Sequence, residues 1–120
     1  MKRLMRNKAI FVFLFSASAF SILQAQVDTA TIVGTVQDSS GAIVPGASVT
    51  ATEVNTNIKT STRTDTAGNY VLTPLKIGNY AVAVEAQGFK KETRGGVVLQ
   101  VQDRVRVDFA LQIGSISEAI

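Results

Sequence analysis

The 120-residue sequence contains no cysteine, no histidine and no tryptophan. Without cysteine or histidine a chain lacks the ligands of the usual zinc sites, the partners of a Cys or Ser/His nucleophile pair and the attachment site of a c-type haem. A disulfide framework is excluded for the same reason. The composition therefore argues against the common nucleophilic and zinc enzymes, and it predicts neither a cofactor nor a metal.

Positive charge is scarce beyond the first eight residues. Four of the 12 Lys and Arg residues lie between Lys2 and Lys8, and from Gln26 onward eight basic side chains accompany nine acidic ones. A nearly neutral body lacks the basic surface that binds a polyanion. The sequence therefore predicts no nucleic-acid partner.

The first 25 residues have the three-part layout of a secretory signal peptide. A basic stretch is followed by the apolar segment Ala9–Leu23, and the small residue Ala25 then precedes polar sequence. The alternative is a membrane anchor, but a helix needs roughly 20 apolar residues to span a bilayer, and this segment is shorter and contains three serines. We expect a helical signal peptide over residues 1–25, cleaved after Ala25, and no transmembrane span in the mature chain.

Beyond Ala25 the apolar residues recur with a period of two. The segment Arg104–Leu111 alternates apolar residues with charged or small ones, as in a strand with one buried and one solvated face. Similar runs occupy Thr31–Val36, Ala47–Thr52, Ile58–Thr64, Tyr70–Leu72, Tyr80–Glu85 and Val97–Val101. We therefore expect an all-β fold, an antiparallel sandwich of seven strands.

Two turns share the pattern Asp-x-x-Gly, at Asp38–Gly41 and Asp65–Gly68. An Asp that opens a type I turn accepts hydrogen bonds from the backbone amides after it, and Gly suits the fourth position. A calcium loop is the alternative, but each turn offers a single carboxylate, whereas calcium takes roughly six to eight oxygens. We interpret both segments as structural turns. Further turn signals are Pro45-Gly46, Gly78-Asn79, Gln87-Gly88 and Gly95-Gly96.

The turns and strands together resemble a known family. Residues 34–49 read G-T-V-Q-D-S-S-G-A-I-V-P-G-A-S-V, which is similar to the opening of carboxypeptidase regulatory-like domains, G-x-V-x-D-x-x-G-x-x-[LIV]-P-G-A-x-V. The family elements T-D-x-x-G-x-[YF]-x-[LI], L-x-x-G-x-Y and G-[YF] follow in order, up to residue 89. The residues that carry the motif are Gly34, Asp38, Gly41, Pro45, Gly46, Asp65, Gly68, Tyr70, Gly78, Tyr80, Gly88 and Phe89.

The resemblance covers residues 31–111 and implies a transthyretin-like, or prealbumin-like, seven-stranded sandwich with a carbohydrate-binding-like fold. We expect a linker over residues 26–30 and a C-terminal tail or linker over residues 112–120. The resemblance is to the accessory domain of carboxypeptidases and not to their catalytic domain, so it implies no enzyme. The acid pairs Glu85 with Glu92 and Asp103 with Asp108 are interpreted as solvated surface groups, and no catalytic residue is expected.

The segment Leu111–Glu118 resembles the exit from such a domain in TonB-dependent outer-membrane receptors of Gram-negative bacteria, where the sandwich is an N-terminal periplasmic extension. We expect an exported, non-catalytic accessory module of this kind, either part of a receptor or a stand-alone secreted protein. Its expected partner is a neighbouring receptor domain or another protein.

The alternative function is a carbohydrate-binding module of a secreted or surface protein. A threonine-rich face would supply hydroxyl groups to a glycan through Thr50, Thr52, Thr60, Thr62 and Thr64. Sugar sites normally also use an exposed aromatic platform, and after the leader the only aromatics are Tyr70, Tyr80, Phe89 and Phe109. We expect most of the ring area of these four residues to lie in the core.

Overall fold

The computed structural model describes residues 28–114, and the regular structure in this part of the chain consists of strands. In chain order they are β1 (Thr29–Asp38), β2 (Ser48–Glu53), β3 (Lys59–Arg63), β4 (Asn69–Lys76), β5 (Gly78–Glu85), β6 (Glu92–Leu99), β7 (Arg104–Arg106) and β8 (Phe109–Leu111). The expected signal peptide, with Ala25, lies outside the described residues, as does residue 115 and beyond. Among the described residues, no helix has the length and apolar character needed to cross a membrane.

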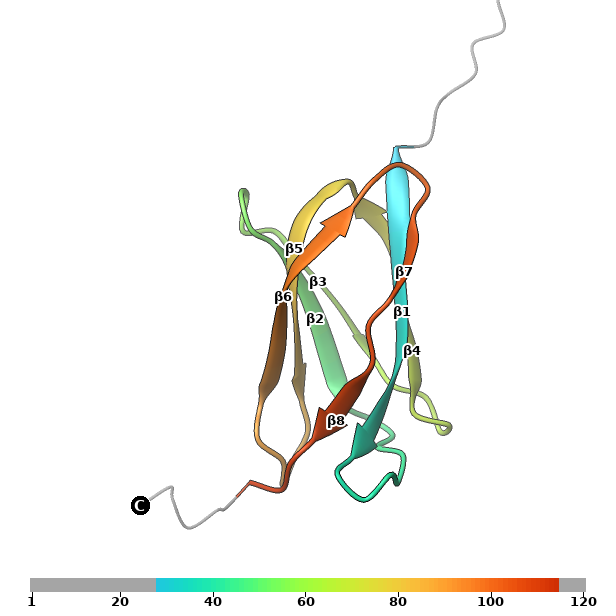
Figure 1. Ribbon diagram of the computed structural model, residues 1–120, viewed down its shortest axis with the longest axis vertical. Coiled ribbons are helices and arrows are strands. Elements are labelled where there is room, and N and C mark those ends of the chain that lie inside the picture. The colour runs from blue at the N-terminus through green and yellow to red at the C-terminus, as the bar shows by residue number, and fades with distance from the viewer. Residues whose placement is uncertain (1–27, 115–120) are drawn as a thin grey trace, which may run out of the picture.

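The strands form two sheets that face each other across the core (Figure 1). One sheet has the order β3-β2-β5-β6, and all of its pairs are antiparallel. In the other sheet β1 pairs antiparallel with β4 and parallel with both β7 and β8. The predicted all-β sandwich is confirmed, and the antiparallel arrangement holds for all strand pairs of residues 28–114 except those of β1 with β7 and β8.

The segment Arg104–Leu111, expected to form one strand, is divided into β7 and β8, which gives eight strands in place of the seven expected. The expected faces are correct, since Val107, Phe109 and Leu111 are buried. The interruption falls opposite Gly34, where a Cβ atom would collide with the carbonyl oxygen of Val107. The Val107 carbonyl oxygen therefore lies against the bare backbone of Gly34, and regular pairing with β1 resumes only at Phe109.

Strand β6 also differs from its expected position, Val97–Val101. It begins at Glu92 and ends at Leu99, because Gln100–Asp103 forms a turn that is closed by the bond from Asp103 N to Gln100 O at 3.0 Å. The Gly95-Gly96 pair, expected to be a turn, lies inside β6. The register with β5 shifts here, and Gly96 has a φ of 73°, so the pair forms an irregularity within the strand.

Paired residues also occur in the described parts of the two flanking segments that were expected to be a linker and a tail. Strand β1 begins at Thr29, and Ala30 is buried in the core. At the other end, Ile113 pairs with Phe89 in an isolated antiparallel bridge. Backbone pairing is therefore present at Thr29 and at Ile113, just outside the expected bounds of residues 31–111.

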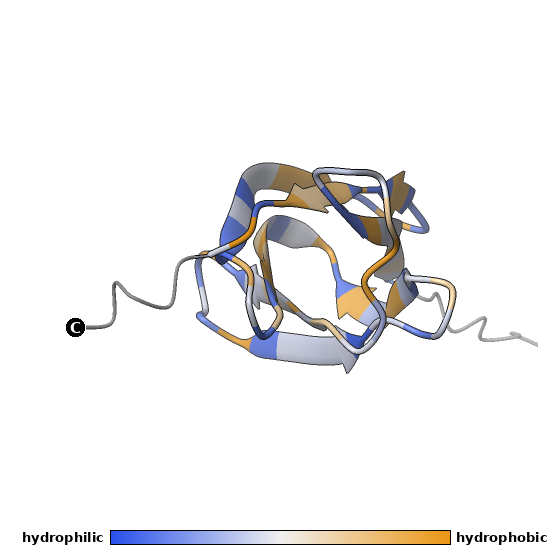
Figure 2. Cartoon of the chain, turned by 90° about the horizontal axis from the view of Figure 1, so that it is seen from below, coloured by the Kyte–Doolittle hydropathy of each residue, from blue (hydrophilic) through white to orange (hydrophobic). Residues whose placement is uncertain are grey.

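The core lies between the two sheets, as the inward alternation of apolar residues predicts. Its largest fully buried side chains are Ile32, Leu72, Leu75, Leu99, Leu111, Val36, Val49, Val82 and Val84. Figure 2 shows hydrophobic and hydrophilic residues alternating along the strands that surround this core. Three of the four expected core aromatics, Tyr70, Tyr80 and Phe109, are buried, whereas Phe89 is half-buried at the edge of the cluster.

Candidate functional site

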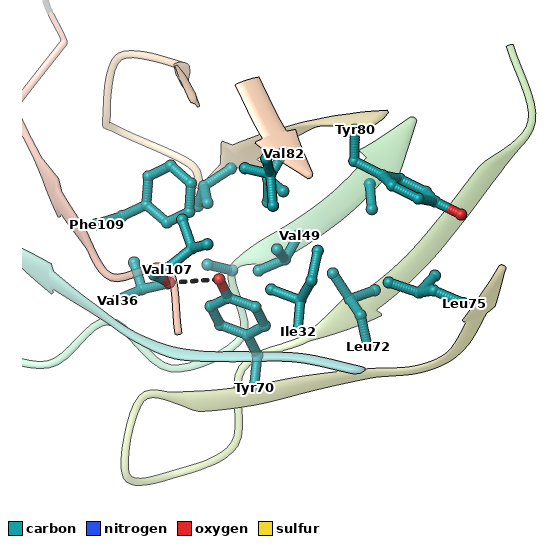
Figure 3. Packing of buried hydrophobic residues seen from close by; sticks show 14 of the residues in the cluster. Ile32, Val36, Val49, Tyr70, Leu72, Leu75, Tyr80, Val82, Val107 and Phe109 are labelled. Carbon is teal, nitrogen blue, oxygen red and sulfur yellow. Dashed lines mark hydrogen bonds between the residues drawn. The ribbon is translucent and has the colours of Figure 1, made fainter. Parts of the chain in front are cut away.

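The first residue of the family motif, Gly34, meets Tyr70, the aromatic residue that follows the second Asp-x-x-Gly turn. These residues are register partners in the β1–β4 pair, and a Cβ on Gly34 would lie 2.8 Å from the Tyr70 ring and hydroxyl. The hydroxyl donates a hydrogen bond to the carbonyl oxygen of Val107 (Figure 3). Burial, together with the negative charge of Asp108, raises the pKa of Tyr70. Tyr70 therefore ties β4 to the β7–β8 junction across the bare backbone of β1.

The two Asp-x-x-Gly segments form turns in which the Asp side chain bonds to the following backbone. Asp38 Oδ1 accepts from Ser40 N at 2.8 Å, from Ser40 Oγ at 2.6 Å and from Ala42 N at 3.0 Å. These hydrogen bonds hold the pKa of Asp38 below its ordinary value. Asp65 Oδ1 accepts from Ala67 N and Asn69 N, both at 2.9 Å. Backbone donors therefore occupy one oxygen of each carboxylate.

The glycines that close these turns adopt backbone conformations that other residues rarely adopt, with φ of 94° at Gly41 and 79° at Gly68. Gly68 is also confined, because a Cβ there would lie 3.0 Å from Val36 O and from Ile43 Cβ. Gly68 N donates to Asp65 O at 2.9 Å. The second turn therefore sets the start of β4 and directs Tyr70 into the core.

Pro45 and Gly46 are exposed and lie in the turn before β2. The turn is held by Thr64, a buried polar residue, whose hydroxyl donates to Val44 O at 2.7 Å and accepts from Ala47 N at 2.8 Å. Gly46 N donates to Thr64 O at 3.0 Å. Pro45-Gly46 therefore connects the two sheets, and Thr64 stabilises that connection.

Gly78 and Tyr80 lie beside a buried acid, Glu53, that the sequence reading did not single out. A Cβ on Gly78 would lie 2.6 Å from Glu53 Oε2. Glu53 Oε1 accepts from Thr56 N at 2.8 Å and from Thr56 Oγ1 at 2.9 Å. Burial raises the pKa of Glu53, but these bonds and nearby backbone amides outweigh it, so that the pKa lies below its ordinary value. The sequence did contain an indication that Glu53 is buried. Val49 and Ala51 face inward, and the same alternation places Glu53 inward.

Tyr80 directs its hydroxyl away from the middle of the core, as Figure 3 shows, and donates to Lys76 O at 2.8 Å. Burial and the charge of Glu53 raise the pKa of Tyr80. A hollow of about 580 Å³ next to these groups is lined by Glu53, Tyr80 and Gly78, together with apolar side chains that include Ile58, Pro74 and Ile77. The hollow lies between the β2–β3 and β4–β5 connections.

Gly88 and Phe89 lie in the β5–β6 loop, where they contact the chain that follows β8. Gly88 has a φ of 87°, and its carbonyl accepts from Gly114 N at 3.0 Å. Lys90 N donates to Gln112 O at 2.8 Å. The chain that leaves β8 is therefore bound to the β5–β6 loop.

The motif residues thus occupy turns and strand crossings, and the structure brings them together in small groups and not in one cleft. Among residues 28–114, there is no group of three or more His, Cys, Asp or Glu side chains that could hold a metal ion. Of the acids considered as pairs, Glu85 lies 3.7 Å from Lys91 Nζ, Asp103 Oδ2 accepts from Gln100 N, and Asp108 Oδ1 accepts from Thr35 N. These three acids therefore take part in an ion pair or in hydrogen bonds within the domain.

The expected threonine-rich face is divided between two sides of its sheet. Thr60 and Thr62 pair with the inward-facing Ala51 and Val49, and Thr64 is buried. Only Thr50 and Thr52 face outward. They line a polar hollow of about 270 Å³ with Ser48, Lys59, Ser61, Ala83, Glu85 and Lys91. The expectation of a single face was wrong because the β2–β3 register places the threonines of β3 opposite inward positions.

Comparison with known proteins gives a family match over most of the described residues. The family model described as the carboxypeptidase regulatory-like domain matches residues 31–112. A sequence relative is the TonB-dependent transporter Oar of Myxococcus xanthus, which is 29% identical over 125 residues. The match covers 100% of this chain and 11% of the transporter, so the chain spans about a tenth of the length of this curated relative.

Solved structures with a similar fold have diverse names. The catechol 1,2-dioxygenase of Acinetobacter radioresistens has a TM-score of 0.59 at 17% identity, with 76% of this chain and 54% of the other covered. A proposed carbohydrate-binding protein from Bacteroides uniformis has a TM-score of 0.55 at 20% identity, with coverage of 68% and 40%. A type II cohesin–X-dockerin complex from Acetivibrio cellulolyticus has a TM-score of 0.55 at 16% identity, with coverage of 71% and 58%. At these identities the likeness shows the fold alone.

Proposed function

This chain belongs to the carboxypeptidase regulatory-like domain family, as its motifs predicted, and from that membership we propose that it is a non-catalytic, exported accessory module. Its place is the N-terminal extension of a TonB-dependent outer-membrane receptor of a Gram-negative bacterium. The observation that carries the proposal is the match to the Myxococcus transporter, which covers this whole chain and only 11% of the relative. A small domain joined to a much longer receptor accounts for that ratio.

The geometry supports a role as a rigid module. The motif residues stabilise turns and strand crossings, and the acids among them are engaged by backbone amides. Such a domain acts by presenting its solvated faces or a strand edge to a neighbour. We propose that this neighbour is another domain of the receptor or a protein that binds the receptor in the periplasm.

Export requires the leader. We propose that residues 1–25 are a signal peptide that is removed after Ala25. Mass spectrometry of the protein recovered from the periplasm or medium tests this, with Gln26 expected as the first residue. A first residue of Met1 would contradict export by this route.

The reading frame after the Ile120 codon in the genomic DNA tests the receptor assignment. A frame that continues into a plug and alternating barrel strands is the expected result. A stop codon followed by unrelated genes would contradict the receptor and favour the secreted alternative.

A carbohydrate-binding module is the second candidate, favoured by the polar hollow on the outer face of β2 and β3. The hydroxyl oxygens of Thr50 and Ser61 lie 2.9 Å apart there. Lys59 and Lys91 also line this hollow. The proposed carbohydrate-binding protein from Bacteroides uniformis shares the fold. Glycan-array binding that is lost in a Thr50→Ala, Ser61→Ala double variant, and kept in the exposed-turn control Thr66→Ala, would support this function. Absence of binding by the unmodified chain would contradict it.

A further inference from the structure

The two ends of the described domain lie at opposite ends of the sandwich (Figure 1). Strand β1 begins at Thr29 and has 10 residues, a length of about 33 Å at the usual rise per residue. Because β8 runs parallel to the end of β1, Leu111 lies beside Asp38 and far from Thr29. Tension along the polypeptide therefore acts on the N-terminal end of β1 and on the C-terminal end of β8, the strand paired with it.

This arrangement determines how tension acts on the bonds. When two parallel, adjacent strands are pulled at the N-terminus of one and the C-terminus of the other, the strands must slide past each other. The force then acts along both strands and displaces every pair at once, so that the evenly spaced hydrogen bonds of the parallel ladder carry the load together. If the same strands are pulled apart from one end, the bonds break one after another.

The bonds between β1 and the C-terminal strands extend along most of β1. Thr31–Val33 pairs with Arg104–Arg106, and Val36–Asp38 pairs with Phe109–Leu111. Near the start of β1, Gln102 N donates to Thr29 O at 2.8 Å, and Thr31 N donates to Asp103 O at 2.9 Å.

The gap between β7 and β8 is bridged by other groups. Val107 N donates to Val33 O at 2.9 Å, and Asp108 Oδ1 accepts from Thr35 N at 2.8 Å. Arg106 donates from Nη2 to Thr35 Oγ1 at 3.0 Å and from Nε to Asp108 Oδ2 at 3.1 Å. The C-terminal segment therefore remains hydrogen-bonded to β1 across the gap between β7 and β8.

We propose that this domain is a load-bearing link, which resists tension along the polypeptide by shearing β1 against β7 and β8. This mechanical role is separate from the accessory function, because it depends on the described strands and not on membership of a receptor. It holds equally for a secreted protein in which the domain lies between two other segments.

Single-molecule pulling on the full chain tests the proposal, and the absence of native cysteine makes introduced cysteines specific handles. The variant Asp28→Cys with Gln112→Cys loads the strands in shear. The variant Asp28→Cys with Val101→Cys opens the same strands from one end, and all three positions are exposed. We expect the unfolding force in shear to be at least about twofold higher, because many bonds share the load. Equal forces, or a lower force in shear, would overturn the proposal.

A second comparison tests the bridge over the gap. Asp108→Ala in the shear pair removes the acceptor of Thr35 N, and we expect it to lower the unfolding force. Glu85→Ala is the matched control, since Glu85 is an exposed acid with one ion pair on the other sheet, and it is expected to leave the force unchanged. An Asp108→Ala force equal to that of the control would contradict the assigned role of the bridge. Neither pulling result bears on the receptor assignment, which the genomic reading frame tests separately.

Discussion

Tyr70 lies directly opposite Gly34 in the β1–β4 pair, and its hydroxyl bonds to Val107 on the far side of β1. Only glycine at position 34 leaves room for both the ring and the Val107 carbonyl. Two residues of the family motif, 36 positions apart in sequence, thus serve one contact. The Gly34–Tyr70 pair explains why the motif begins with a glycine and includes an aromatic residue after its second turn.

The Gly34→Ala variant is expected to destabilise the domain by about 3 kcal/mol, because the added methyl group forces the Val107 backbone to move. Gly95→Ala is the matched control: Gly95 also lies in a strand, and its Cβ would meet open space. We expect the control to change the free energy of unfolding by less than about 0.5 kcal/mol. Urea unfolding followed by circular dichroism measures both, and equal effects would contradict the role given to Gly34.

The Tyr70→Phe variant is expected to lose about 1–3 kcal/mol, because it leaves the carbonyl of Val107 without its buried donor. Tyr80→Phe removes the bond to Lys76 O at a less buried site, and we expect a loss of about 1 kcal/mol or less. Thermal unfolding of the two variants gives the comparison. A Tyr80→Phe loss greater than that of Tyr70→Phe would contradict the importance given to the hydrogen bond between Tyr70 and Val107.

Tyrosinate absorbance gives a prediction at alkaline pH, since the chain has two tyrosines and no tryptophan. Both pKa values are raised by burial above the ordinary value of 10.0. The unfolded chain therefore releases these protons first, and stability is lost as the pH rises above about 10. We expect tyrosinate to appear together with the loss of circular dichroism. Full ionisation near pH 10 in a chain that remains folded would contradict the burial of the two hydroxyls.

The Glu53 carboxylate gives a prediction at acid pH. Its pKa in the folded chain lies below the ordinary value of 4.5, so its contribution to stability is present above that value and is lost as the pH falls through the folded pKa. Urea midpoints measured from neutral to acid pH should fall less for Glu53→Gln than for the unmodified chain. Glu85→Gln, an exposed acid in a surface ion pair, should retain the full decrease. An unchanged pH dependence in Glu53→Gln would contradict the role assigned to this carboxylate.

The faces of the strands were predictable from the sequence, because side-chain alternation is local. Residues 104–111 show this, since the inward positions Val107, Phe109 and Leu111 are buried as expected. The division of the same segment into β7 and β8 was not predictable. It depends on Gly34, about 70 residues earlier, and no local pattern indicates that the Val107 carbonyl lies against that glycine.

The surroundings of several polar side chains were also not predictable from local sequence. Thr60 and Thr62 have a strand-like spacing, but their side of the sheet follows from the register of β3 against β2, which the sequence does not state. Glu53 follows the inward alternation of β2, yet an acid is rarely buried without a partner, and its partner Thr56 becomes apparent only when the β2–β3 turn is formed. The Asp-x-x-Gly turns were interpretable because all their bonds lie within five residues.

The most direct test of the proposed function is an immunoblot of outer-membrane, periplasmic and medium fractions of the source cells, with an antibody raised against residues 28–114. We predict that the domain appears in the outer-membrane fraction, within a polypeptide far longer than 120 residues. A small product confined to the cytoplasm or to the medium would contradict the assignment to an outer-membrane receptor.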